Sequence, residues 1–147
     1  MTDPSINSGF NNCVFCKIVT GDIPSHKVYE DADTLAFLDI HPVNAGHTLV
    51  IPKAHFENFA QTPKETAATL LHLSQRLAPG ILKAVGADAF NLSTNNGRAA
   101  GQLVFHTHFH LIPRFPADGH KMWQGSDEHQ DFAAMALKIK ECVGRSA

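Results

Sequence analysis

The chain has 147 residues and a formal net charge of −2 at pH 7; 44% of its residues are hydrophobic and 18% are charged. This length predicts one compact domain with its own core, and the balanced charge argues against a nucleic-acid partner, which normally requires a basic stripe. No apolar run approaches the ~20 residues of a membrane span, so no membrane partner is expected either. Residues 1–7 lack the basic and apolar segments of a signal peptide, which favours a cytoplasmic protein.

The apolar pattern along the chain predicts five strands. They are expected where β-branched and aromatic residues lie between turn-forming residues, at residues 27–30, 34–39, 47–52, 90–94 and 103–112. Residues 1–11 are small and polar, so we expect a disordered N-terminal tail followed by a single domain over residues 12–147.

The first of two main helices is expected to begin with a capping box. Thr62 is the expected N-cap, Pro63 the first helical residue and Glu65 the reciprocal cap. The helix should kink at Pro79 and end at Gly86. Its core side is marked by apolar residues at helical spacing, namely Leu70, Leu73, Leu77, Ile81 and Val85.

A last helix is expected over residues 127–143, with Ser126 as its cap. Its apolar residues should face the core: Phe132, Met135, Ile139 and Val143. Successive strands with helices between and after them predict an α+β domain built on a five-stranded antiparallel sheet.

Three histidines, His106, His108 and His110, recur at a spacing of two within the last expected strand. Side chains alternate across a strand, so the three imidazoles should share one face of the sheet. Neighbouring members would start about 6.6 Å apart and the outer pair about 13 Å apart. Zinc binds nitrogen at roughly 2 Å, which argues against a single metal held by all three. The run therefore predicts different roles for the three histidines.

Two of the three cysteines, Cys13 and Cys16, form a C-x-x-C pair. In a reducing compartment this spacing indicates metal binding or redox chemistry. A thioredoxin-like site would have a strand before the pair, and here the preceding residues are rich in Gly and Asn. Metal binding is favoured, because the ten histidines of the chain can supply the remaining ligands of a zinc site.

Several segments in this order resemble the histidine triad (HIT) family, in its bacterial Hit-like branch related to the nucleotide-binding HINT hydrolases. The matching segments lie at residues 13–18, 35–40, 46–55, 95–97, 101–102 and 106–112. The resemblance implies a HIT-like fold whose sheet is extended by homodimerisation. It also implies hydrolysis or transfer of a nucleoside monophosphate, with adenosine 5′-phosphoramidates as the favoured AMP conjugates of a purine nucleotide class.

The resemblance assigns catalytic roles to three histidines. His108 is the expected nucleophile, which carries the nucleotide covalently, and a neutral imidazole can do this if its other nitrogen is held in one tautomer. His47 is expected to orient the nucleophile, although a strand-edge histidine bonded to backbone remains an alternative. His110 is expected beside the leaving group, where an imidazolium could stabilise charge or donate a proton.

The resemblance also implies a nucleotide site and a structural zinc site. The expected nucleotide-binding residues are Phe15, Ile18, Phe37, Asp39, Ile40, Asn95, Gly101, Gln102, Leu103 and Val104. For the apolar members a plain core role is the alternative, and for Asp39 the alternative is a turn residue. The expected zinc ligands are Cys13, Cys16, His55 and His106, with no open coordination position.

Two positions depart from the family pattern. Leu103 stands where a small hydroxyl residue is common, and Thr107 replaces an apolar residue inside the triad. A leucine cannot donate a hydrogen bond to a leaving group, so turnover and leaving-group preference are open. This departure keeps a nucleotide-binding regulatory module with negligible turnover as an alternative function. Within the enzyme class, diadenosine polyphosphates are the alternative substrates.

Overall fold

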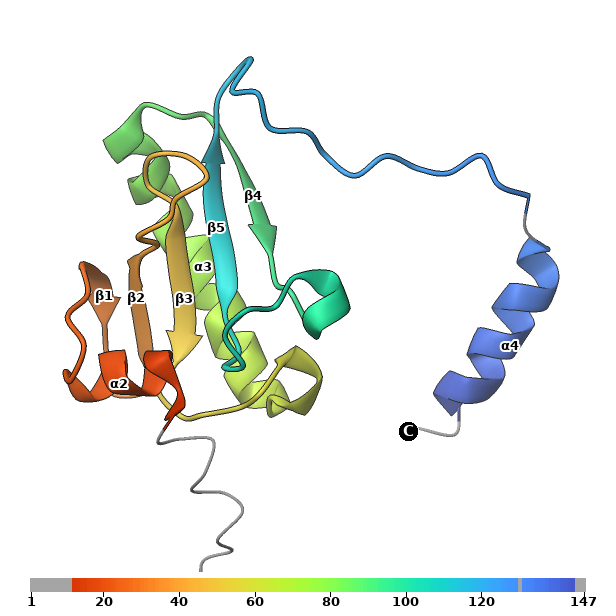
Figure 1. Ribbon diagram of the computed structural model, residues 1–147, viewed down its shortest axis with the longest axis horizontal. Coiled ribbons are helices and arrows are strands. Elements are labelled where there is room, and N and C mark those ends of the chain that lie inside the picture. Colours follow the sequence, from red (N-terminus) through yellow and green to blue (C-terminus); the bar gives the residue numbers. More distant parts are fainter. Residues whose placement is uncertain (1–11, 130, 145–147) are drawn as a thin grey trace, which may run out of the picture.

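The computed structural model describes residues 12–129 and 131–144, and it contains the expected five-stranded antiparallel sheet (Figure 1). The strands lie in the order β1-β2-β3-β5-β4, and every neighbouring pair is antiparallel. Their bounds are β1 Lys27–Glu30, β2 Thr34–Leu38, β3 Thr48–Pro52, β4 Ala89–Ser93 and β5 Phe109–Arg114. The α+β fold predicted from the sequence is confirmed, whereas the expected tail, residues 1–11, lies outside the described residues.

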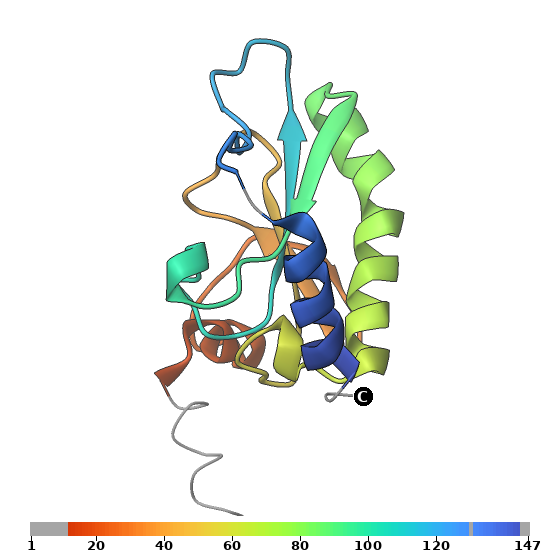
Figure 2. The same ribbon diagram turned by 90° about the vertical axis from the view of Figure 1, so that its right-hand side faces the viewer.

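Two helices cover opposite faces of the sheet, α2 (Val14–Thr20) in front and α3 (Lys64–Val85) behind in the view of Figure 1, and Figure 2 shows them on either side. Alternating strand residues divide the core accordingly. The α3 side contains Ala36, Val50, Leu70, Leu73 and Phe109, and the α2 side contains Phe15, Ile18, Leu35, Phe37, Leu49 and Ile51. Two short 3-10 helices, Phe59–Gln61 and Arg98–Ala100, belong to the loops.

The last strand is shorter than expected, because β5 begins at Phe109 and not at residue 103. Its partner β3 ends at Pro52, and the β3–β5 register sets Val50 opposite Phe109. Continuing this register would bring Thr107 opposite Pro52, which has no N–H to donate. The Thr107 N–H donates instead to the Phe56 carbonyl at 2.7 Å.

The start of α3 also differs from the expected capping box. Pro63 occupies the N-cap position without a side-chain cap. The Thr62 hydroxyl instead donates to the Asn58 carbonyl and contacts the Thr107 hydroxyl at 2.7 Å. The helix continues through Pro79, and it ends as expected at Gly86, whose φ of 72° is left-handed.

The last helix, α4 (Phe132–Gly144), begins five residues later than expected. Asp131 caps it by accepting from the Ala134 N–H. The prediction that its apolar residues face the core is wrong within one chain: Phe132 is 73% exposed, and Met135, Ile139 and Val143 are exposed as well. An extended segment carries α4 away from the sheet (Figure 1). Among the described helices, none has the length and apolar character needed to cross a membrane.

Candidate functional site

Five of the ten histidines gather on the α2 side of the sheet, where His47 precedes β3, His55 follows it and His110 lies in β5 opposite Leu49. His106 and His108 belong to the loop that leads into β5. His47, His106 and His108 are buried. The edge of the Phe15 ring packs against the rings of His106 and His108, with centroids 5.9 and 5.1 Å apart. The three triad histidines therefore lie close together, as predicted, although His110 alone of the three lies in a strand.

Backbone carbonyls fix the tautomers of His106 and His108. His106 Nε2 lies 2.8 Å from the Pro52 carbonyl, and His108 Nδ1 lies 2.6 Å from the His106 carbonyl. A carbonyl can only accept, so each of these ring nitrogens carries a proton. In the neutral rings, His106 keeps its lone pair on Nδ1 and His108 keeps its lone pair on Nε2.

The lone pair of His106 faces a cluster formed by Cys13, Cys16, His55 and His106, which we call the Cys/His cluster. The two imidazole Nδ1 atoms lie 3.2 Å apart. The Cys16 sulfur lies 3.3 Å from His55 Nδ1 and 3.5 Å from His106 Nδ1, and the Cys13 sulfur lies 3.5 Å from His106 Nδ1. A tetrahedral zinc ion places two nitrogen ligands about 3.3 Å apart, and nitrogen and sulfur ligands about 3.5 Å apart. The cluster has the ligand types and spacing of such a site.

Burial shapes the protonation of this cluster. It raises the pKa of the Cys16 thiol to about 12, with further contributions from the hydrogen bond and charge of Cys13. Burial also lowers the pKa of His106 to about 4, which leaves the ring neutral near pH 7. A divalent cation bound here would favour the thiolate forms, because its charge offsets the cost of burying them.

His47 and His110 form a hydrogen-bonded pair with a defined direction. The Val43 backbone N–H donates to His47 Nδ1 at 3.0 Å, so the proton of neutral His47 is on Nε2. His47 Nε2 lies 2.9 Å from His110 Nδ1, which must therefore accept. Neutral His110 carries its proton on Nε2, a buried atom with no hydrogen-bond partner among the described residues. We call the chain from the Val43 N–H through His47 to His110 the relay.

The relay histidines and His108 are held in the neutral form. Burial lowers the pKa of His47 and of His108, and it lowers the pKa of His110 to about 4. The imidazolium considered for His110 is therefore disfavoured in the free protein. The site instead presents a neutral lone pair on His108 Nε2 and an N–H donor on His110 Nε2, with ring centroids 5.0 Å apart.

The apolar residues expected to hold the base lie in the core of the free chain. Phe15, Ile18 and Phe37 are all buried on the α2 side of the sheet. Of these three side chains, Phe15 packs against the ring of His108, and it also packs edge-on against Phe37 with ring centroids 5.4 Å apart. All three residues therefore have the core role that was the alternative for them. A contact of Ile18 or Phe37 with a nucleotide stays a prediction.

The expected ribose residues follow β2. Asp39 Oδ1 accepts from the His41 N–H, which is the turn role considered for it, and Asp39 Oδ2 lies 3.6 Å from His47 Nε2. Ile40 is exposed. This carboxylate adjoins the relay, and its ribose contact stays a prediction.

The polar loop before the triad is braced by Gln102. Its side-chain amide donates to the carbonyls of Glu57 and Val104 and accepts from the Gly97 N–H. Asn95 is half-buried, and its side-chain nitrogen lies near Gly101. Leu103 is 90% exposed. The loop is ordered by backbone contacts, and its nucleotide contacts remain predictions.

Several supporting residues were not identified from the sequence. The buried Thr107 hydroxyl is satisfied by the Thr62 hydroxyl and the Phe56 carbonyl, so its polar departure from the family pattern has a local partner. Arg114 and Asp118, four residues apart after the triad, form a two-bond ion pair. Their spacing around a turn was the available sequence signal.

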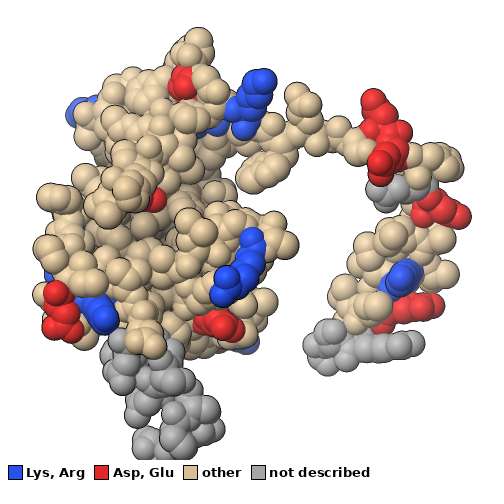
Figure 3. All heavy atoms as spheres, viewed as in Figure 1, with Lys and Arg blue, Asp and Glu red and all other residues tan. Residues whose placement is uncertain are grey.

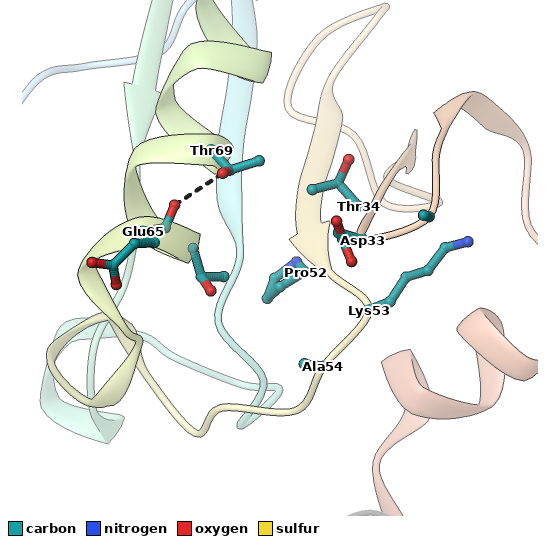
Figure 4. Close-up of a pocket in the computed structure, with 9 residues that line it drawn as sticks. Asp33, Thr34, Pro52, Lys53, Ala54, Glu65 and Thr69 are labelled. Carbon is teal, nitrogen blue, oxygen red and sulfur yellow. Dashed lines mark hydrogen bonds between the residues drawn. The ribbon is translucent and has the colours of Figure 1, made fainter.

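The structure also has two surface hollows, and His108 lines neither of them. One, of about 490 Å³, is lined in part by Asp33, Lys53, Glu65 and Thr69 (Figure 4), and the Thr69 hydroxyl donates to the Glu65 carbonyl. The other, of about 540 Å³, adjoins the Cys/His cluster and Leu103. On the face seen in Figure 3, basic and acidic side chains are interspersed around the edge, and an acidic side chain is also visible towards the middle.

The fold and the histidine arrangement define a histidine triad protein. Residues 20–117 match the family model described as the HIT domain, and the chain belongs to the HIT domain family.

Two curated relatives have enzymatic names. Adenylylsulfatase HINT3 of Arabidopsis thaliana is 47% identical over 74% of this chain and 55% of its own length. Adenosine 5′-monophosphoramidase hnt1 of Schizosaccharomyces pombe is 48% identical over 70% of this chain and 74% of its own length.

Solved structures show the same fold. A HIT family protein from Bacillus anthracis has a TM-score of 0.85 and 40% identity, and the match covers 93% of this chain and 98% of that one. A zinc-bound histidine triad family protein from Mycobacterium smegmatis has a TM-score of 0.73 and 43% identity, with 80% and 86% covered.

Proposed function

We propose that this HIT domain protein is a nucleotide hydrolase that cleaves AMP conjugates of the adenosine 5′-phosphoramidate type through a nucleotidyl intermediate on His108. The observation that carries the proposal is the pair of oriented ring nitrogens. His108 presents a lone pair on Nε2, and His110 presents beside it a buried N–H that has no hydrogen-bond partner in the described part of the chain. The names of two relatives, an adenylylsulfatase and an adenosine 5′-monophosphoramidase, support an adenylyl conjugate as substrate.

The proposed reaction has two displacements at phosphorus. In the first, the His108 Nε2 lone pair forms a bond to phosphorus and the P–N bond breaks; the amine leaves with that electron pair and takes a proton from solvent, which the water of the second displacement later returns. The His110 N–H donates a hydrogen bond to the oxygen or nitrogen on which charge develops. In the second, water attacks the nucleotidyl-histidine and releases AMP. Overall one water is consumed, with its oxygen in AMP and a proton on the amine.

The backbone supports the nucleophile throughout this cycle. Attack makes the His108 ring cationic, and its Nδ1–H already donates to the His106 carbonyl at 2.6 Å. This hydrogen bond strengthens as positive charge forms, so it favours the intermediate over the free ring. His47, which the relay connects to His110, completes the catalytic set of His47, His108 and His110.

The Cys/His cluster is proposed to hold one structural zinc ion. The ligand types, their tetrahedral spacing and a zinc-bound solved relative support this assignment. When bound, the ion would join α2 to the loop after β3 and to the triad segment. His106 would then fix the segment that carries His108.

A homodimer is proposed as the assembled form. β4 is an edge strand, and its Phe90 and Leu92 are 42% and 39% exposed. α4 on the same chain exposes a second apolar surface, so a twofold pair of chains could cover both. Sedimentation equilibrium should give the mass of two chains, and a Phe90→Asp variant should shift the equilibrium towards the monomer. A wild-type monomer at high micromolar concentration would refute this assembly.

The test of the function is incubation with a panel of adenosine 5′-phosphoramidates, adenylyl sulfate and diadenosine polyphosphates. Product AMP is measured by chromatography, and rapidly quenched protein is examined by intact mass for an added adenylyl group. Fastest turnover of the phosphoramidates with an adduct supports the proposal. Fastest turnover of diadenosine polyphosphates would favour that alternative substrate class. AMP binding without turnover would favour the regulatory module, which the exposed Leu103 keeps as the second candidate.

A further inference from the structure

The loop between β2 and β3 contains the residue that sets the direction of the relay. The Val43 backbone N–H donates to the His47 ring at Nδ1. The backbone N–H of His47 donates to the Asn44 carbonyl. Gly46 allows this loop to approach the body closely, because a Cβ there would lie 2.9 Å from Val85 and 3.2 Å from Pro113. The orientation of His47 therefore depends on the position of a backbone amide in a loop.

The Val43 amide constrains both histidines of the relay. An N–H can only donate, so a neutral His47 cannot carry its proton on Nδ1 while this bond persists. Its Nε2–H then donates to His110 Nδ1, and the His110 proton is directed to Nε2. If the amide moved away, both tautomers of His47 would become available, and His110 could lose its free N–H donor. The donor on His110 is thus set by a group two hydrogen bonds away.

The loop is held in place by groups in the last two residues of β5 and in the turn that follows it. The Asn44 side-chain amide donates to the Pro113 carbonyl and to Asp118 Oδ2, both at 2.9 Å. Asp118 is fixed by two hydrogen bonds from Arg114, at 2.7 and 2.9 Å. His120 Nε2 contacts the Val43 carbonyl at 3.1 Å. In Figures 1 and 2 the β2–β3 loop lies beside the C-terminal end of β5, as these bonds require.

We propose that Asn44 and Asp118 are positioning residues for catalysis, because they hold the Val43 amide that sets His47 and His110 in their donor tautomers. The role of His110 in turnover rests on the function proposed above. The tautomer of the relay does not, because it is a property of the free protein. Neither Asn44 nor Asp118 needs to touch the nucleotide.

The chain offers a matched pair of variants for the test. Asn44→Ala removes two of the hydrogen bonds that hold the loop, those to the Pro113 carbonyl and to Asp118. Asn91→Ala removes a hydrogen bond to the same ion pair, since Arg114 Nη1 donates to Asn91 Oδ1 at 2.7 Å. Within residues 12–129 and 131–144, no hydrogen bond joins the Asn91 side chain to the β2–β3 loop. Both variants are measured by long-range proton–nitrogen NMR of the histidine rings, which reports which ring nitrogen carries the proton, and by steady-state kinetics with an adenosine 5′-phosphoramidate.

In the wild type, His47 and His110 should each carry the proton on Nε2. Asn44→Ala should give mixed tautomers at His47 and lower kcat about tenfold, as expected for a weakened hydrogen bond in the transition state, with KM changed less than twofold. Asn91→Ala should leave the tautomers and kcat unchanged. If Asn44→Ala does not fold, the isosteric Asp118→Asn replaces it, with a smaller change in the same direction.

Three outcomes would overturn the proposal. They are a single Nε2–H tautomer and unchanged kcat in Asn44→Ala, a tautomer change without a fall in kcat, and an equal fall in kcat in Asn91→Ala. Absence of turnover in the wild type would instead refute the proposed function, and the NMR comparison would still decide whether Asn44 sets the relay.

Discussion

His106 and His108 are two residues apart and have the same side chain, yet the structure directs them to opposite kinds of partner. The His106 ring is tied to a carbonyl through Nε2, so its Nδ1 faces the Cys/His cluster. The His108 ring is tied to a carbonyl through Nδ1, so its Nε2 is left as the lone pair. The backbone carbonyl that each ring binds therefore decides its chemistry.

This difference explains how one short run can serve two sites. A metal ligand and a nucleophile both need a neutral imidazole with one available lone pair. Burial supplies the neutral form for both residues, since it lowers the pKa of each. Both imidazoles are thus neutral, and the two proposed roles differ only in which ring nitrogen is bonded to a backbone carbonyl.

The largest expected effect falls on the His108 side of the comparison. His108→Gly removes the lone pair that attacks phosphorus, so kcat should fall by about four orders of magnitude or more. Circular dichroism should show a retained fold, and AMP binding by calorimetry should remain measurable. Substantial residual hydrolysis in a folded His108→Gly protein would rule out a nucleotidyl-His108 intermediate.

On the His106 side, the expected effect is on stability. Elemental analysis should find about one zinc per chain, because the cluster offers four ligands. A Cys13→Ser/Cys16→Ser variant should lose the ion and about 4 kcal/mol of stability, and Tm should fall by roughly 10 °C. Calorimetry measures the shift, and Cys142→Ser is the matched cysteine control. A metal-free protein with unchanged Tm would contradict a structural metal.

The sequence was sufficient for the fold because strand alternation and helical spacing are local properties. It was insufficient where a neighbour decides the outcome. The early start expected for β5 failed because β3 ends at Pro52, and the Thr107 N–H donates to the Phe56 carbonyl instead. The inward face expected for α4 failed because helical periodicity specifies an apolar side but not the surface that covers it.

The candidate site was predictable to a similar degree. Residue types and the family resemblance predicted which side chains would gather in the Cys/His cluster and around His108. They could not predict the relay, because its first member is the Val43 backbone amide, which has no side-chain signature. Ring orientation likewise depends on carbonyls of Pro52 and His106, and any residue type supplies a carbonyl.

A smaller effect on the rate is expected from a substitution at Leu103, a position that the family resemblance places beside the leaving group. The family resemblance places a hydroxyl here, and a hydrogen bond to a charged group is worth about 1.5–3 kcal/mol. Leu103→Ser should therefore raise kcat/KM on amine-leaving substrates by about one to two orders of magnitude. Leu103 is 90% exposed, so stability should not change. Leu103→Ala is the control for lost bulk, and an equal increase in both variants would exclude the hydroxyl as the cause.

The smallest effect concerns His110 and the pH dependence of stability. Burial lowers the pKa of His110 from its ordinary value of 6.5 to about 4, so the unfolded chain binds more protons between these values. The stability that this neutral ring contributes is complete above pH 6.5 and is lost as the pH falls towards 4. For this one group, the free energy of unfolding should be about 2 kcal/mol higher at pH 7.5 than at pH 5. Urea denaturation of the wild type and of His110→Gln at both pH values isolates the contribution of His110 to the free energy of unfolding, because the other histidines are common to the two proteins. The variant should lose about 2 kcal/mol of the pH dependence. An identical pH dependence would mean that His110 is not held neutral by its surroundings, and the donor role of its Nε2 would have to be abandoned.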